Sequence, residues 1–333
     1  MGARGRKRKR GVGRILLRWA GLLLLAVLLI LVALRVAASL REHTDQAPAG
    51  TVYFQTPGGR VAARVAGPAS GQVIVIVHGT AAWSGFWKDV AAHLAGKGWR
   101  VVAIDLPPFG WSDRDPQARY DRVSQAERLS AVLTAQKRPA IVIGHSFGAG
   151  SVVELALRHP AQVRGLVLVD AALGELDPKG ETPAARAFRV KPIAQLTTSA
   201  MLTNPLALKP FLRSLLARKE QAAPWIETLR EPMRRSGTTS AYAAWLPNLF
   251  TKRDNALSRR TANLKTIRVP VTLIWGRADT VTPLDQGERI AALTNARSIE
   301  VLPGVGHIPH IEDPAAFDAA LDGALVHITE GGR

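Results

Sequence analysis

Residues 141–151 read IVIGHSFGAGS, and this stretch decides how the rest of the chain is interpreted. Its first residues are apolar or small, as in a buried strand, and residues 149–158 have the composition of a helix. Between them, residues 144–148 match the G-x-S-x-G pattern of a sharp strand-to-helix turn. We therefore predict a strained backbone at Ser146, with glycine at 144 and 148 because side chains there would collide with the neighbouring strand and helix.

The same context predicts an anion site beside Ser146. The first amides of the following helix, together with the positive end of its dipole, point at the serine hydroxyl and would stabilise negative charge that forms there. A five-residue pattern alone recurs by chance in unrelated chains. The strand before it and the helix after it are what give this match its weight.

Length, composition and charge limit the domain organisation, the chemistry and the partners of the chain. With 333 residues, the chain can form one large α/β domain with an appendage. It has no cysteine, which excludes disulfides, thiolate catalysis and cysteine-based metal sites. The net charge is +18, and residues 1–18 hold eight of the basic residues and no acidic one. Such a tail can bind nucleic acid, but the apolar run that follows favours a membrane segment, so we expect no nucleic-acid partner.

The N-terminal apolar run predicts contact with a lipid bilayer. Residues 19–34 contain no charge, and with their apolar flanks they are long enough to cross a membrane as a helix. Because Arg and Lys precede this run, we predict a cytoplasmic tail over residues 1–14, a transmembrane signal anchor over residues 15–40, and an extracytoplasmic chain thereafter, periplasmic if the protein is bacterial. The competing interpretation is a signal peptide cleaved near Ala38; the length of the run and Arg35 argue against it.

After a polar linker over residues 41–50, strand and helix patterns alternate. This alternation predicts right-handed crossovers and a mostly parallel sheet. Residues 51–171 and 259–333 form the predicted core. Strands are expected at residues 51–56, 60–66, 72–77, 99–104, 141–143, 163–169, 269–275 and 298–302.

Residues 172–258 interrupt this alternation, because they contain no β-branched run. Prolines divide the segment into short helical pieces, which predicts a helical cap over the sheet. The segment has thirteen basic and seven acidic residues, so it is positively charged. We interpret this charge as a solvated face, with contact to anionic lipid headgroups as the alternative.

A serine nucleophile needs a base, and the base needs an acid that orients it. Asp279 follows the strand predicted at 269–275, and His307 follows the last predicted strand. Both therefore fall at strand carboxyl ends, where open α/β sheets bind ligands. The order Ser146, Asp279, His307 is that of the α/β-hydrolase triad. Asp170 stays open as an alternative acid, and His310 as an alternative base.

With these motifs the chain resembles the α/β-hydrolase fold family from about residue 51 onward. The matching segments are His78-Gly79, the loop DLPPFGWS at 105–112, GHSFGAG, WGRADTVTP and GVGHIPHIEDP. The resemblance implies an eight-stranded sheet with a helical cap, a catalytic triad of Ser146, Asp279 and His307, and oxyanion-hole amides at Phe147 and at Thr80 or Ala81. One departure is Pro108, where many members have glycine. Candidate pocket residues are Trp83, His145 and Trp87.

We therefore predict a membrane-anchored serine hydrolase that cleaves an ester or related acyl bond of a small molecule. The alternatives are C–C bond hydrolysis of a meta-cleavage product, perhydrolysis, or a non-catalytic binding module on the same fold. No nucleotide-loop or H-E-x-x-H motif occurs, so neither a cofactor nor a metal is expected. The sequence leaves the oligomeric state and the exact substrate open.

Overall fold

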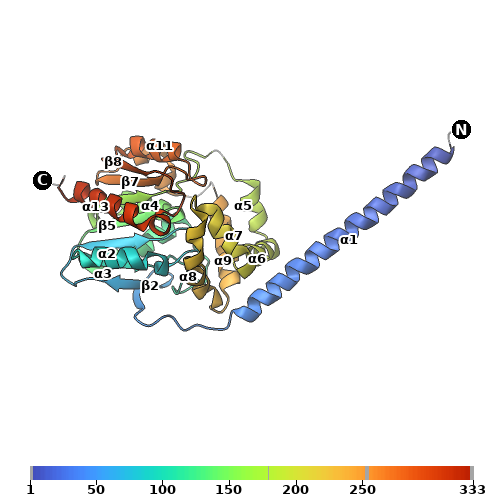
Figure 1. The fold of residues 1–333 in the computed structure, drawn as a ribbon, viewed down its shortest axis with the longest axis horizontal. Helices are drawn as coiled ribbons and strands as arrows, with labels where there is room; N and C mark the ends of the chain where they lie inside the picture. The colour runs from blue at the N-terminus through green and yellow to red at the C-terminus, as the bar shows by residue number, and fades with distance from the viewer. Residues whose placement is uncertain (1–2, 179, 252–254, 331–333) are drawn as a thin grey trace.

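The computed structural model describes residues 3–178, 180–251 and 255–330. Helices surround a central sheet, a group of helices lies to one side of it, and a long N-terminal helix, α1 (Ala3–Arg41), extends away from the body (Figure 1).

The sheet has eight strands in the order β1-β2-β4-β3-β5-β6-β7-β8. β2 pairs antiparallel with both β1 and β4, and the strands from β4 to β8 pair in parallel. The fold is therefore the mostly parallel sheet that the strand pattern predicts. The strands are β1 (Val52–Thr56), β2 (Gly59–Ala66), β3 (Val73–Val77), β4 (Arg100–Ile104), β5 (Ala140–His145), β6 (Val163–Val169), β7 (Val271–Gly276) and β8 (Ser298–Leu302).

Both faces of the sheet are covered. In β3 every residue is buried, and alternate side chains enter different apolar cores: Ile74 and Ile76 enter one, and Val73 and Val75 the other. The first core is closed by α2 (Lys88–Gly96) and α13 (Pro314–Glu330). The second is closed by α3 (Arg122–Gln136), α4 (Phe147–Arg158) and α11 (Leu284–Thr294). This two-sided burial explains the continuous β-branched run of the strand.

The first helix after β3 is preceded by a short turn. Ser84–Trp87 forms a 3-10 turn, and α2 starts at Lys88. The backbone N–H of Ser84 donates to Asp105 Oδ1 at 2.7 Å, which ties this turn to the loop after β4. A contact so distant along the chain leaves no periodic signal in the sequence.

Between β6 and β7 lies the cap, which we define as the helices α5 to α9. Two of its helices begin with proline, a residue suited to the first helical position. The helices are α5 (Pro183–Phe188), α6 (Lys191–Ala200), α7 (Pro205–Leu215), α8 (Ile226–Arg230) and α9 (Thr238–Phe250), with 3-10 turns at Lys219–Trp225 and Glu231–Arg234. The shorter remaining elements are 3-10 turns at Pro160–Gln162 and Leu257–Arg259 and the helices α10 (Thr261–Leu264) and α12 (Pro309–Glu312).

Helix α1 contains a segment, Ile15–Arg41, that is long and apolar enough to cross a membrane. Residues 42–44, at the start of the predicted linker, are hydrogen-bonded to the cap region. The backbone N–H groups of His43 and Thr44 both donate to Arg234 O, at 2.9 and 3.1 Å, and Glu42 Oε1 accepts from Thr239 N at 2.7 Å. The end of α1 is thus bonded to the cap.

Candidate active site

The strand-to-helix turn is built as its glycines predict. Ser146 has φ 49° and ψ −125°, a strained conformation for a residue with a side chain. A Cβ at Gly144 would lie 2.8 Å from Ala149 Cα, and one at Gly148 would collide with the carbonyl oxygen of His78. Glycine at both positions lets β5 and α4 approach closely enough to present the serine hydroxyl.

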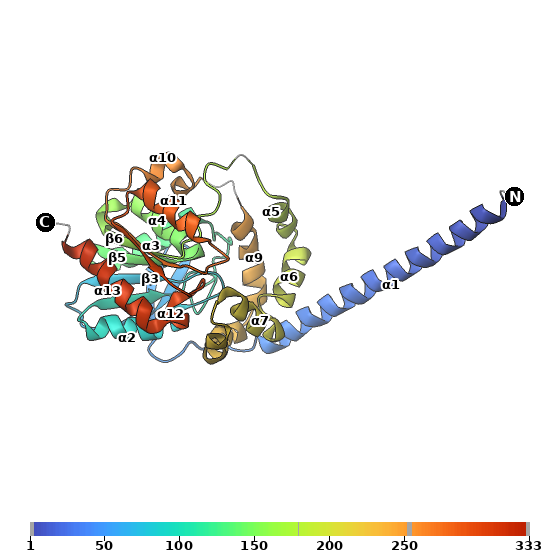
Figure 2. The same ribbon diagram turned by 45° about the horizontal axis from the view of Figure 1, so that its top comes forward.

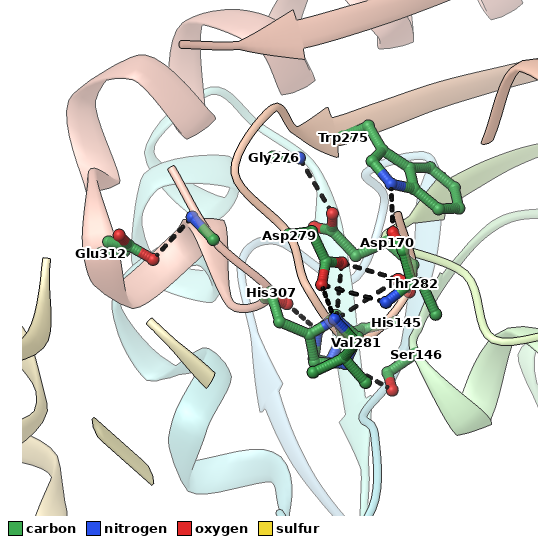
Figure 3. Close-up of polar contacts among 11 residues, drawn as sticks. His145, Ser146, Asp170, Trp275, Gly276, Asp279, Val281, Thr282, His307 and Glu312 are labelled. Atoms are coloured by element: carbon green, nitrogen blue, oxygen red, sulfur yellow. Dashed lines mark hydrogen bonds and ion pairs between the residues drawn. The ribbon is translucent and has the colours of Figure 1, made fainter. Parts of the chain in front are cut away.

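The structure brings Ser146, His307 and Asp279 together at the carboxyl edge of the sheet (Figure 3). Ser146 Oγ lies 2.8 Å from His307 Nε2, and His307 Nδ1 lies 2.7 Å from Asp279 Oδ2. The three residues are 7%, 4% and 5% exposed, respectively. With Nδ1–H donating to the carboxylate, Nε2 is free to accept the serine proton, which is the arrangement that activates a hydroxyl.

The loop after β7 orients the Asp279 carboxylate. Its Oδ1 accepts from the backbone N–H groups of Val281 and Thr282, at 2.7 and 3.0 Å, and its Oδ2 also accepts from Thr282 Oγ1 at 2.6 Å. Burial acts to raise the pKa of Asp279, but the hydrogen bond and charge of His307 and the bonds from Thr282 lower it overall. The carboxylate is therefore ionised at neutral pH.

Asp170, the alternative acid, lies beside Asp279 and makes a different contact (Figure 3). Its Oδ1 accepts from Gly276 N at 2.9 Å, whereas His307 Nδ1 bonds to Asp279. Burial, followed by the negative charge of Asp279, raises the pKa of Asp170 well above its usual range. The pKa values of the two carboxyl groups are thus shifted in opposite directions, and of the two it is Asp279 that bonds to the imidazole.

Two backbone amides border the space in front of Ser146. Phe147 is the first residue of α4, and Thr80 follows β3; both line the cavity described below. Among the described residues, neither N–H has a hydrogen-bond acceptor. Ala81, the alternative to Thr80, has φ 56° and packs in an apolar cluster with Phe109. Unpaired amide donors, one of them at the start of a helix, are suited to hold an oxyanion.

His78 and Asp105 fix the loops around this space. His78 Nδ1–H donates to Gly79 O at 2.7 Å, and its Nε2 accepts from Leu106 N at 2.8 Å. Burial lowers the pKa of His78 to about 4, so the ring is neutral. Asp105 accepts from Trp111 N at 2.8 Å as well as from Ser84 N. Both side chains therefore serve to hold loop backbone in place.

A largely apolar cavity of about 250 Å³ opens in front of Ser146, between the sheet edge and the cap. Trp87 and His145 line it. Trp83 does not; this candidate pocket residue is buried in the core, where its indole N–H donates to Thr228 O at 2.6 Å. The other lining residues are Gly79, Thr80, Ala82, Phe86, Phe147, Ala172, Phe211, Leu212, Leu215, Leu229, Leu249, Val281, His307, Ile308 and His310.

The two remaining histidines of the site are neutral. His145 Nε2–H donates to His307 O at 2.9 Å, and burial, followed by the charge of His307, lowers the pKa of His145 to about 3. His310 stacks on Trp87 with ring centroids 3.9 Å apart, and burial lowers its pKa well below the usual value. The Ser146 hydroxyl contacts His307, not His310.

Sequence reasoning missed the cap residues of the cavity and the role of Thr282. Phe211, Leu212 and Leu249 come from helices whose packing no local pattern predicts. Thr282 has a weak signal, since it lies three residues after Asp279 in a turn of the kind that aspartate side chains cap.

A model of the alpha/beta hydrolase fold matches residues 72–314, which is more than half of the chain. The chain belongs to the α/β hydrolase fold family. This α/β hydrolase is 29% identical to the 2-hydroxymuconate semialdehyde hydrolase of Pseudomonas sp. strain CF600, covering 74% of this chain and 84% of that one. It is 27% identical to the pimeloyl-[acyl-carrier protein] methyl ester esterase of Neisseria meningitidis serogroup B, covering 74% of this chain and 90% of that one.

Among solved structures, the crystal structure of a membrane phospholipase A matches this α/β hydrolase with a TM-score of 0.66 and 23% identity. The match covers 97% of this chain and 99% of the other. At this identity the likeness concerns the fold alone.

Proposed function

We propose that this α/β hydrolase is a serine esterase that cleaves esters with apolar acyl groups. The observation that carries the proposal is the hydrogen-bonded chain from Ser146 through His307 to Asp279, with distances of 2.8 and 2.7 Å, at the wall of an apolar cavity. In the proposed reaction, His307 Nε2 takes the serine proton while Oγ attacks the ester carbonyl. The tetrahedral oxyanion accepts hydrogen bonds from the amides of Phe147 and Thr80.

The protonated His307 then gives its proton to the leaving alkoxide as the C–O bond breaks, which leaves the acyl group on Ser146. Water enters, His307 takes a proton from it, and the hydroxide attacks the acyl carbon. Return of the proton to Ser146 Oγ releases the carboxylic acid. Asp279 stays ionised throughout and stabilises the transient imidazolium.

The cavity lining favours an apolar acyl group over a dianionic substrate. No Arg, Lys, Asp or Glu is among the described residues that line it. A carboxylate placed there would lose its hydration without gaining a cationic partner, which costs several kcal/mol. The volume of about 250 Å³ lies just below the range of roughly 300–1,000 Å³ typical of drug-sized ligands. We therefore expect short and medium acyl chains to react fastest.

C–C bond hydrolysis is the second candidate, because one curated relative at 29% identity is named for 2-hydroxymuconate semialdehyde. A direct comparison separates the two. We expect turnover of p-nitrophenyl butyrate to exceed turnover of 2-hydroxymuconate semialdehyde by a large factor. The opposite ranking of kcat/KM would replace the esterase proposal with the C–C hydrolase.

The test of the serine nucleophile uses a fluorophosphonate probe and intact mass. We expect one covalent adduct on the wild type and none on Ser146→Ala, which should lose nearly all esterase activity. Ser214→Ala is the matched control, because Ser214 is exposed in α7. A folded wild-type protein that neither reacts with the probe nor hydrolyses any ester would favour a binding module on this fold.

We further propose that α1 anchors the enzyme in a membrane, with the N-terminus in the cytoplasm and the catalytic domain outside it. The support is the apolar length of Ile15–Arg41 and the basic residues that precede it. Because the chain has no cysteine, a Thr329→Cys variant can be labelled at one site. We expect a membrane-impermeant maleimide to label Cys at position 329 in spheroplasts. A mature chain that begins after residue 38 would indicate a cleaved signal peptide instead.

A further inference from the structure

The cap lies against the last turns of α1, and the contacts show how the two are aligned. Arg35 Nη2 donates to Ser240 Oγ at 3.3 Å, and Gln195 Nε2 donates to the same oxygen at 3.4 Å. Further along, Arg41 Nη2 donates to Thr203 O at 3.3 Å. Helix α6 therefore runs in the same direction as α1, with Gln195 level with Arg35. Figure 2 shows α6 beside the end of α1 that meets the body, and because Gln195 lies near Arg35, the first turn of α6 lies on the N-terminal side of Arg35 along α1.

The side chains of α1 agree with this alignment. Leu31, Leu34 and Ala38 share one face of the helix; Ala38 is buried and the two leucines are half-buried, whereas Val32 and Val36 are exposed. Contact with the cap thus begins near Leu31. If the hydrocarbon layer starts at Ile15, about 20 residues at 1.5 Å each span its ~30 Å and end near Leu34. The start of α6 then lies at the boundary between lipid tails and headgroups.

The surface at this end of the cap has the composition of an interfacial segment. We define the α5–α6 face as Arg186, Arg189, Val190, Lys191 and Ile193, all of which are exposed. Val190 and Ile193 keep 49% and 44% of their surface in solvent. Basic residues next to exposed aliphatic ones are what amphipathic segments present to a membrane surface.

The positive charge of the α5–α6 face favours anionic lipid headgroups. Arg189 pairs with Glu181, but within the described chain neither Arg186 nor Lys191 has an acidic partner. Residues 172–258 carry thirteen basic and seven acidic side chains, so the excess of positive charge extends over the cap. Anionic headgroups attract such residues with about 1 kcal/mol each close to the surface.

The face is continuous with the rim of the active-site cavity. Phe188 of α5 packs on Phe250 of α9 with ring centroids 5.2 Å apart. The neighbouring Leu249 lines the cavity and is still 42% exposed, so it lies at the opening. The contact between Phe188 and Phe250 thus connects the α5–α6 face to the cavity opening at Leu249.

We infer that the α5–α6 face lies in the headgroup layer of the anionic leaflet next to it, so that the cavity opens at the lipid surface. This inference rests on the proposed anchoring by α1. It adds a partner, an anionic bilayer, that contacts the cap as well as the helix. It also implies that, among esters with the short and medium acyl chains that fit the cavity, those that partition into the bilayer are preferred over those that stay dissolved in water.

The test uses the full chain in nanodiscs of phosphatidylcholine and phosphatidylglycerol. Ile193→Cys carries an environment-sensitive fluorophore, and lipids with a nitroxide near the headgroup serve as quencher. Val326→Cys in α13 is the matched control, because Val326 is 46% exposed and α13 lies on the side of the body away from α6 (Figure 1). We expect a blue-shifted, quenched emission at position 193 and neither at 326. Equal, unquenched emission at both positions in anchored protein would overturn the inference.

A charge-reversal pair provides a second measurement. Arg186→Glu with Lys191→Glu should weaken quenching at position 193 and lower turnover of a bilayer-partitioned ester by about tenfold, while kcat/KM for soluble p-nitrophenyl acetate stays unchanged. Lys265→Glu with Arg268→Glu, an equal charge change on an exposed surface away from the face, should change neither. Equal loss with both pairs would also overturn the inference. Carbonate extraction is run in parallel, because release of the chain would show instead that the anchoring proposal is wrong.

Discussion

The sharpest test of the proposed chemistry is Asp279→Asn, because the structure fixes which way the new amide must turn. Asp279 Oδ1 accepts two backbone N–H groups, from Val281 and Thr282. An amide oxygen can keep both bonds, and an NH₂ group cannot. The NH₂ would therefore occupy the Oδ2 position and face His307 Nδ1, 2.7 Å away in the wild type.

That orientation changes the tautomer of His307. Nδ1 would have to accept a hydrogen bond from the amide, so the ring proton would move to Nε2, which then cannot take the proton of Ser146. We expect kcat to fall by about 10⁴-fold, equivalent to about 5.5 kcal/mol of transition-state stabilisation. The assay is p-nitrophenyl butyrate hydrolysis by full-length protein in detergent, with thermal unfolding measured in parallel to show that the variant is folded.

Asp170→Asn is the matched control. Burial raises the pKa of Asp170, and its Oδ1 accepts from Gly276 N, a bond that an amide oxygen can also accept. We expect kcat to stay within about tenfold of wild type. The reasoning is refuted if Asp170→Asn loses a thousandfold or more while Asp279→Asn remains active.

Three further predictions concern stability and the acyl pocket. His145 is neutral in the fold, with a pKa of about 3, and in the unfolded chain it takes up a proton below about pH 6.5. Acid therefore favours unfolding, and between pH 7 and 5 the wild type should lose about 2 kcal/mol of unfolding free energy relative to His145→Gln in urea titrations; a gap independent of pH would contradict this. Gly148→Ala should destabilise the fold by about 1–3 kcal/mol, because its Cβ would meet the carbonyl oxygen of His78. Gly323→Ala, in α13 with open space around it, should raise stability by up to about 1 kcal/mol, and equal thermal shifts in both variants would disprove the packing argument. Leu229→Trp should fill part of the cavity and move the chain-length optimum of p-nitrophenyl esters toward shorter acyl groups; an unchanged optimum would show that the acyl chain lies elsewhere.

The sheet could be predicted almost strand by strand, because its signals are local. β6 and β8 have the predicted bounds, since each is a short segment with valine or isoleucine at several positions. The positions of Ser146, Asp279 and His307 could be predicted too, because parallel strands deliver the loops at their carboxyl ends to one edge. The places of the Trp83 and Trp87 side chains could not be predicted in this way. They lie four residues apart, and only tertiary packing directs one to Thr228 and the other to the cavity.

The choice between Asp170 and Asp279 likewise depends on tertiary contacts. Each follows a sheet strand, so sequence position alone leaves both at the same edge. The difference arises from the turn at Val281 and Thr282, which aims the Asp279 carboxylate at the imidazole, and from the bond that holds Asp170 to Gly276. Side-chain hydrogen bonds of this kind have no periodicity from which they could be predicted.

The bonds between residues 42–44 and the cap affect how the enzyme can open. Ser236 N donates to Thr44 O at 2.9 Å, and Thr44 forms a parallel bridge with Arg235, so this segment joins the helices above the cavity before it reaches β1. If α1 is fixed in a bilayer as proposed, these bonds tie the cap to the anchor, so that any opening of the cavity would move the catalytic sheet and leave the cap in place. Such an opening would depend on the viscosity of the aqueous phase more than on the fluidity of the lipid, because the sheet is the part that lies in water.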